Sequence, residues 1–198
     1  MPHYRRAHQK NGQYFFTVVT GNRNPVLVHE PILQALREAI QQVRKDLPFA
    51  IDAWVLLPDH MHCIWTLPEG DDAYGKRWSI IKRLVSKTVA GATGSPLPAD
   101  REQYSKAGCA VRTVLPTRSQ QKRRESGFWQ RRFWEHLIQD QNDFHRHFDY
   151  IHFNPVKHGL VSRVDDWPYS SFHRYVSEGV YQTSWGGNEE YDKGMFGE

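Results

Sequence analysis

Two histidines separated by one residue, His60 and His62, have the spacing in this sequence most suited to chemistry. They lie in a segment, residues 53–67, that is rich in the aliphatic and aromatic residues typical of β-strands. Side chains alternate between the two faces of a strand, so both imidazoles should project from one face and Met61 from the other. Two neutral imidazole nitrogens can bind one divalent metal ion. The alternative is that they are two polar residues on the solvated face of a half-buried strand.

Tyr150 and Asn154 stand four residues apart in a later segment that has helical periodicity. At that spacing two side chains share one face of a helix, with their Cβ atoms about 5–6 Å apart. An amide oxygen suits Mg²⁺ or Mn²⁺, and a tyrosine hydroxyl can act as a nucleophile that forms a phosphoester. If this helix faced the strand with His60 and His62, a metal held by His, His and Asn would polarise a phosphodiester. Alternatively, Tyr150 packs in the core and Asn154 caps the helix before a proline.

Three more polar residues lie close to these candidates in the sequence. Glu135 and His136 are adjacent in a predicted strand, so they face opposite sides and at most one of them can join the site. His136 is either a neighbour of the site or a hydrogen-bonded structural histidine. His147, three residues before Tyr150, could touch the tyrosine or bind phosphate when protonated.

The elements that would position these residues alternate between strand and helix patterns. Strands are predicted over residues 14–20 and 49–57, from His60 onward, and over 133–140. Helices are predicted over 30–45, over 78–90, and from a cap at Asp140 or Asn142 to Asn154, where Pro155 should end the helix. Pro58 and Asp59 should form the turn of a hairpin. This order predicts an α+β, ferredoxin-like sandwich in which a central antiparallel sheet carries the His-x-His strand and helices pack on it.

The chain has 198 residues, enough for one domain with a proper core. We expect a domain over residues 1–175, interrupted by an irregular basic insert at 91–127, and a C-terminal tail over 176–198. The two cysteines form no paired motif, and no apolar run approaches about 18 residues. The basic N-terminus is not followed at once by an apolar stretch. These features favour a reduced, cytoplasmic protein without a membrane segment.

Basic residues are concentrated in two parts of the sequence. Lys and Arg number 26 against 22 acids, and seven of the 26 lie between residues 112 and 132, with Glu125 as the single acid there. A second cluster contains Lys76, Arg77, Lys82, Arg83 and Lys87. Such clusters fit a phosphate backbone better than a small acidic molecule. By charge alone, a solvated linker and an ordinary helix face explain them equally well.

Three segments together carry a resemblance to a known family. They are residues 54–65, with the sequence WVLLPDHMHCIW, residues 128–136, with FWQRRFWEH, and residues 149–161, with DYIHFNPVKHGLV. In this order they resemble the REP-associated tyrosine transposases, a domesticated branch of the single-tyrosine HUH transposases. The resemblance covers about residues 4–175, apart from the insert.

The resemblance implies a role for each candidate residue. His60 and His62 would be ligands of a divalent metal, Mg²⁺ or Mn²⁺, Tyr150 would be the catalytic tyrosine, and Asn154 would occupy the place of the third ligand. The implied activity is cleavage and rejoining of single-stranded DNA at repetitive extragenic palindromes (REP), through a 5′-phosphotyrosine and a free 3′-OH. It also implies recognition of a hairpin with a short guide tetranucleotide 5′ to its foot.

The implied partner is a single-stranded DNA hairpin of the REP type, bound by a monomer or a homodimer. Arg131 and Arg132 stand beside Trp129 and Phe133, and this mixture of cations and aromatic rings suits phosphate contact and base stacking. The alternative is that the aromatic residues are core and the arginines surface. The DNA-contact residues that we expect are Arg131, Arg132, Lys157, Lys82, Arg83, Arg123 and Arg124.

Two other functions are compatible with the sequence. One is a non-catalytic regulator that binds hairpin DNA and keeps the fold, although intact His60, His62 and Tyr150 argue against it. The other is a metallohydrolase of small molecules, which would need a further imidazole or carboxylate on the metal and an enclosed pocket.

Overall fold

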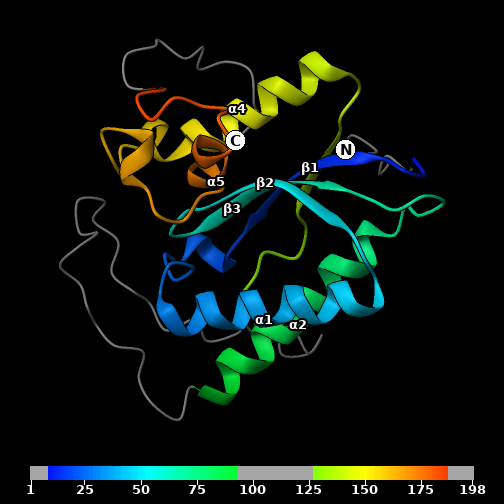
Figure 1. The fold of residues 1–198 in the computed structure, drawn as a ribbon. Helices are drawn as coiled ribbons and strands as arrows, with labels where there is room; N and C mark the ends of the chain where they lie inside the picture. The colour runs from blue at the N-terminus through cyan, green and yellow to red at the C-terminus, as the bar shows by residue number, and fades with distance from the viewer. Residues whose placement is uncertain (1–8, 93–126, 187–198) are drawn as a thin grey trace, which may run out of the picture.

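The structure is a computed structural model that describes residues 9–92 and 127–186 (Figure 1). Four strands, β1 to β4, form one antiparallel sheet in the order β2-β3-β1-β4. The strands are β1 (Gln13–Val19), β2 (Ala50–Leu56), β3 (His60–Thr66) and β4 (Trp134–Leu137). The helices are α1 (Glu30–Asp46), α2 (Tyr74–Ala92), α4 (Gln141–Lys157) and α5 (Phe172–Ser177), with short 3₁₀ turns η1 (Gly21–Arg23) and η3 (Val164–Asp166).

The chain order β1-α1-β2-β3-α2-β4 and this strand order are those of a ferredoxin-like sandwich. The predicted fold class is therefore confirmed, including the hairpin of β2 and β3. The hairpin is closed by a hydrogen bond from the Leu57 amide to the His60 carbonyl, 2.8 Å long. In β3 the pairing with β1 places His60 opposite Val19 and His62 opposite Thr17.

Helices cover both faces of the sheet, with α1 and α2 on one side and α4 and α5 on the other (Figure 1). Alternation along β3 explains the division: Met61, Cys63 and Trp65 pack in the same core cluster as the apolar residues of α1 and α2. Ile64 belongs to the second cluster, together with Ile151 of α4. Because both faces are covered, β3 is buried at every position except its last, and its two histidines lie under α4 rather than in solvent.

Two predicted helix boundaries are wrong. Helix α2 begins at Tyr74, four residues before the expected start, because a hydrogen-bonded turn at Asp71 and Asp72 leads directly into it. Helix α4 begins after its predicted cap, Asp140, whose carboxylate accepts from the Asp143 amide at 2.8 Å. It continues through Pro155 to Lys157 instead of ending at Asn154.

Proline is tolerated in α4 because it lies in the last turn. It removes only one backbone donor there, and the amides of His158 and Leu160 still bond to the carbonyls of Asn154 and Pro155, at 3.0 and 2.9 Å. Gly159, at φ +66°, follows the helix end. Asn154 is therefore an internal helical residue and not the cap that one interpretation of the sequence expected.

The segment after α5 packs against α4. The ring of Tyr181 stacks on Phe148 with 5.7 Å between centroids, and Trp185 lies 4.5 Å from Tyr181. The expected boundary at residue 175 stays a prediction, and the insert at 91–127 lies almost entirely outside the described residues. Within the described segments no helix has both the length and the apolar character needed to cross a bilayer.

Candidate metal and tyrosine site

His60 and His62 lie side by side on the face of β3 that α4 covers. Their ring centroids are 4.9 Å apart at an interplanar angle of 82°, and the residues are 3% and 0% exposed. The prediction that both imidazoles share one face of a strand is thus met by the geometry. The alternative interpretation, two polar residues on a solvated strand face, is wrong because both residues are buried.

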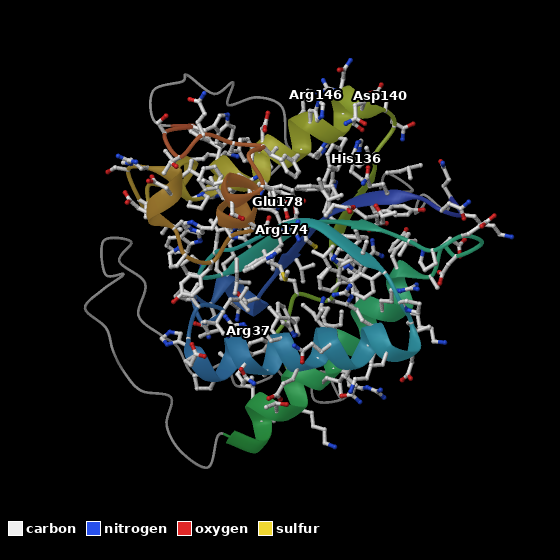
Figure 2. All side chains as sticks on the ribbon, viewed as in Figure 1. Arg37, His136, Asp140, Arg146, Arg174 and Glu178 are labelled. Carbon is white, nitrogen blue, oxygen red and sulfur yellow. The ribbon has the colours of Figure 1, made fainter. Side chains whose placement is uncertain are left out.

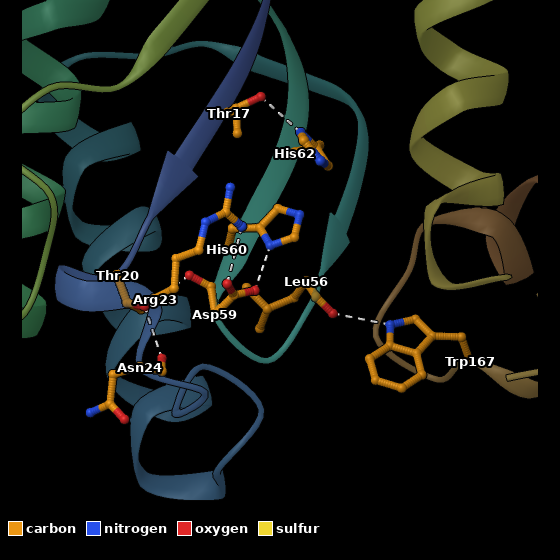
Figure 3. A network of polar contacts seen from close by, with 9 residues as sticks. All are labelled: Thr17, Thr20, Arg23, Asn24, Leu56, Asp59, His60, His62 and Trp167. Carbon is orange, nitrogen blue, oxygen red and sulfur yellow. Dashed lines mark hydrogen bonds and ion pairs between the residues drawn. The ribbon is translucent and has the colours of Figure 1, made fainter. Parts of the chain in front are cut away.

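The Nδ1 atom of each imidazole has a hydrogen-bond partner (Figure 3). Asp59 Oδ1 lies 2.6 Å from His60 Nδ1, and Thr17 Oγ1 lies 2.9 Å from His62 Nδ1. An Nδ1–H that donates to the Asp59 carboxylate leaves the lone pair of His60 on Nε2. His60 Nε2 is buried and has no hydrogen-bond partner among the described residues. This arrangement, with one ring nitrogen held and the other available, is typical of histidines that bind metals.

Asp59 is itself held by Arg23, whose guanidinium lies 3.2 Å from its second carboxylate oxygen. Burial acts to raise the pKa of the Asp59 carboxyl, but the hydrogen bond and charge of His60, together with Arg23, lower it below its usual range. Asp59 therefore remains an anion beside His60 across the physiological pH range.

Two residues of α4 and the residue that follows it, His158, are spaced one helical turn apart on the side of the histidine pair. The ring of Tyr150 lies 5.3 Å from that of His62, and the ring of His158 lies 5.2 Å from that of His60. Asn154 stands between them on the same helix face, because positions four residues apart are neighbours on a helix. Asn154 is fully buried at this position.

The Asn154 amide is a buried polar group without a partner in the part of the chain that the structure describes. The residue is 0% exposed, and neither Oδ1 nor Nδ2 has a hydrogen-bond partner in the described structure. A buried amide without a partner costs about 1–3 kcal/mol, so such a group calls for a ligand or water. Imidazole nitrogens and an amide oxygen are donor types that could hold a divalent cation.

The hydroxyl of Tyr150 contacts a lysine on the next turns of the same helix. Lys157 Nζ lies 3.2 Å from the hydroxyl oxygen and 4.7 Å from the centroid of the ring. An ammonium in that position stabilises a phenolate more than a phenol. Tyr150 is 3% exposed, whereas Lys157 and His158 are exposed, so the site opens to solvent at the C-terminal end of α4.

A second group of donors lies near the start of α4. Among the described residues, His136, Asp143 and His147 bring one donor atom each to within 4.8 Å of one another and could hold a metal ion. Their donors already bond within the group, with His136 Nε2 2.8 Å and His147 Nδ1 3.1 Å from the carboxylate of Asp143. Burial lowers the pKa of His147, so this histidine is neutral at physiological pH. Near the β3 pair, in contrast, His60 Nε2 and the Asn154 amide have no hydrogen-bond partner among the described residues, so these groups could also hold a metal ion.

The structure describes five of the seven predicted DNA-contact residues. Arg131 and Arg132 are exposed at the approach to β4, and Arg83 is exposed on α2. Lys82, also on α2, donates to the Gln130 carbonyl at 2.5 Å. Lys157 lies at the tyrosine, and Arg123 and Arg124 lie outside the described residues.

Arg77, which the sequence placed in a basic surface cluster, is fully buried instead. Its guanidinium forms two bonds to the Asp71 carboxylate, 3.0 and 2.7 Å long, and one to the Pro48 carbonyl. This arginine stabilises the fold and is not available to DNA. Trp129, by contrast, is core as the alternative interpretation expected, at 8% exposed.

Asp59 and Thr17, which hold the two histidines, were not found from the sequence. Asp59 immediately precedes His60, and that adjacency was the available signal. Thr17 could be found only from the register of β1 against β3, which places it opposite His62.

Comparison with known proteins finds similar sequences along nearly the whole chain. Residues 8–74 match the family described as "Transposase IS200 like". The REP-associated tyrosine transposase of Escherichia coli K12 is 43% identical over 188 residues, which is 95% of this chain and 93% of that one. A relative from Haemophilus influenzae is also 43% identical, over 96% of each chain.

A solved structure of a REP-associated tyrosine transposase bound to a REP hairpin is also similar. It matches with a TM-score of 0.71 and 41% identity, covering 99% of this chain and 98% of the other. Identity at this level over nearly the full length of both chains goes beyond a shared fold. The chain therefore belongs to the family of REP-associated tyrosine transposases.

Proposed function

We propose that this protein is a divalent-metal-dependent endonuclease and strand transferase that acts on single-stranded DNA at REP-type hairpins. The observation that carries the proposal is the Asn154 amide, which is buried without a partner among the described residues, on the helix whose Tyr150 ring lies beside His62. It lies one helical turn from Tyr150. A metal donor set beside a tyrosine hydroxyl suits phosphoryl transfer to that hydroxyl.

The donor set would hold Mg²⁺ or Mn²⁺ through Nε2 of His60 and His62 and Oδ1 of Asn154. When bound, the cation would polarise the scissile phosphodiester. Asp59 and Thr17 hold the Nδ1 atoms of the two imidazoles, which leaves Nε2 of each as the atom that would bind the cation.

Tyr150 would then attack the phosphorus in line. A bond forms between the phenolic oxygen and phosphorus, and the bond from phosphorus to the 3′ oxygen breaks. The phenol proton passes to solvent, the leaving 3′ oxygen takes up a proton, and Lys157 stabilises the phenolate that develops. A 3′-OH, either the original one or that of another strand, reverses these steps and rejoins the DNA.

The hairpin in the solved relative supports a hairpin as the substrate of this chain. The exposed Arg131 and Arg132 and the ammonium of Lys157 supply positive charge for phosphate contacts. Base-edge contacts from the same surface would add specificity.

The test is covalent capture of the DNA. A labelled hairpin from the DNA that flanks the encoding gene is incubated with the full chain and Mn²⁺, then run on a denaturing protein gel. A labelled band at the mass of protein plus DNA is expected, and it should disappear with a chelator, with Tyr150→Phe and with Asn154→Ala.

Each negative result points to a different conclusion. If wild type binds the hairpin but forms no adduct, the protein is a hairpin-binding regulator. If Tyr150→Phe still forms the adduct, the nucleophile is another residue. A metallohydrolase of small molecules would keep its activity in Tyr150→Phe.

A further inference from the structure

Trp134, the first residue of β4, is a large aromatic side chain left exposed beside the site. Among the described residues, only Trp134 and Val180 are large hydrophobic side chains exposed to solvent, at 39% and 57%. One exposed apolar side chain is ordinary on a protein surface. The position of Trp134 is what distinguishes it from Val180.

Trp134 lies in the same cross-strand row as a proposed metal ligand. It is paired with Thr17 of β1, and Thr17 is paired with His62 of β3. Residues directly opposite each other on neighbouring strands project to the same face of a sheet. The indole is therefore on the face that carries the histidine pair, two strand spacings or about 10 Å from His62. A DNA strand bound at the metal site can reach it.

The indole ring is already held in one orientation. The ring of Phe15 meets it edge-on, with 5.6 Å between centroids and an interplanar angle of 73°. The ring of His136 lies nearly parallel to it, at 5.9 Å and 6°. His136 is fixed in turn by Asp143, 2.8 Å away, and by the ring of His147, 4.6 Å away. Binding to such a preformed surface requires little loss of side-chain freedom.

The charges around Trp134 favour a nucleic acid over an apolar partner. Arg131 and Arg132 are exposed and precede it in the chain by three and two residues. The carboxylate nearest to His136 is that of Asp143, which is already paired with two histidines and with Arg146, whose guanidinium is 3.7 Å away. Figure 2 shows His136 and Arg146 near the start of α4. Cations next to an exposed aromatic face are typical of surfaces that bind single-stranded DNA.

We propose that Trp134 is a stacking platform for an unpaired nucleobase of the DNA strand that enters the site. Arg131 and Arg132 contact the phosphates that flank this base. The inference rests on the proposed function in that its ligand is the single-stranded DNA next to the hairpin. It assigns Trp134 a role in binding and none in the chemical step.

The test measures binding without cleavage, in the presence of a chelator. The probe is the hairpin with single-stranded extensions at its foot, carrying one 2-aminopurine at successive extension positions, and the same hairpin without extensions is the second probe. Wild type should quench 2-aminopurine at one or two positions, because stacking on an indole quenches this base. Trp134→Ala should abolish the quenching and weaken binding of the extended probe about 5- to 150-fold, as expected when one stacked base is lost.

Three controls make the result decisive. Trp134→Phe, which keeps an aromatic face, should retain most of the affinity, and Val180→Ala, which removes the other exposed apolar side chain, should change nothing. Trp134→Ala should bind the hairpin without extensions as tightly as wild type, which also shows that the variant is folded.

The proposal is overturned if Trp134→Ala binds both probes like wild type, or if it weakens both equally. Failure of the proposed function would look different. A wild-type protein that forms no covalent adduct, yet shows quenching that depends on Trp134, would refute catalysis and leave the stacking platform in place.

Discussion

Replacing Asp59 by asparagine should weaken metal binding without unfolding the protein. The carboxylate lies 2.6 Å from His60 Nδ1, and the imidazole is almost fully buried. Asparagine keeps an oxygen acceptor in the same place but removes the negative charge that makes His60 a better donor. Loss of such a partner typically lowers metal affinity about 10- to 100-fold. This factor corresponds to about 1.4–2.7 kcal/mol of binding free energy.

The assay is a calorimetric titration of the full chain with Mn²⁺. Arg23→Gln is the matched control, because it removes the other partner of Asp59 without touching His60. The Arg23 side chain is 53% exposed, and an ion pair at the surface contributes only about 0–1 kcal/mol, so its effect should be small. Asn154→Ala removes a ligand and should weaken binding at least as much as Asp59→Asn does.

Two results would refute this reasoning. Unchanged Mn²⁺ affinity in Asp59→Asn would show that the carboxylate does not tune His60. Equal losses in Asp59→Asn and Arg23→Gln would show that the effect comes from a general change of the turn between β2 and β3.

Three further predictions concern α4 and its contacts. Lys157→Met removes the ammonium that lies 3.2 Å from the Tyr150 hydroxyl. Because a hydrogen bond to a charged group contributes about 1.5–3 kcal/mol, single-turnover adduct formation should slow about tenfold or more, while Mn²⁺ affinity stays the same. An unchanged rate would contradict this role of Lys157. Ile151→Ala empties a fully buried position between α4 and the sheet and should lower the free energy of unfolding by about 2–5 kcal/mol in urea titrations, a loss that a surface residue would not show. Burial, with a smaller effect of Arg174, lowers the pKa of His152 from 6.5 to about 3. Between these two pH values the unfolded chain therefore binds a proton at His152 that the folded protein does not bind. The contribution of the neutral histidine to the free energy of unfolding is complete above pH 6.5 and is lost as the pH falls towards 3, by up to about 1.4 kcal/mol per pH unit. His152→Asn should flatten that part of the stability profile, and an identical slope in both proteins would rule out His152 as the cause.

Local patterns in the sequence predicted much of the fold. Alternation at His60, Met61 and His62 depends only on the geometry of a strand, and the structure has that geometry. Whether Tyr150 and Asn154 share a helix face depends only on the number of residues per helical turn, so their shared face was also predictable. The order of these elements was enough for the ferredoxin-like sandwich.

Features that depend on packing between distant segments could not be predicted. The predicted end of α4 is wrong because the rule for a residue before proline describes a local steric preference, and the structure keeps Asn154 and Pro155 inside the helix. The burial of Arg77 depends on carbonyls of a loop far away in sequence. The row from His62 through Thr17 to Trp134 exists only once β1 lies between β3 and β4.

Continuation of α4 through Pro155 has a consequence for stoichiometry. One unbroken helix carries Tyr150 and Asn154, and the sheet of the same chain supplies His60 and His62, so a single copy of the protein holds every group in the proposed reaction. In the proposed reaction, none of the donor or nucleophile groups named among the described residues has to come from a second copy. Specific activity should therefore be independent of protein concentration, and an inactive Tyr150→Phe chain mixed with an inactive Asn154→Ala chain should not restore it.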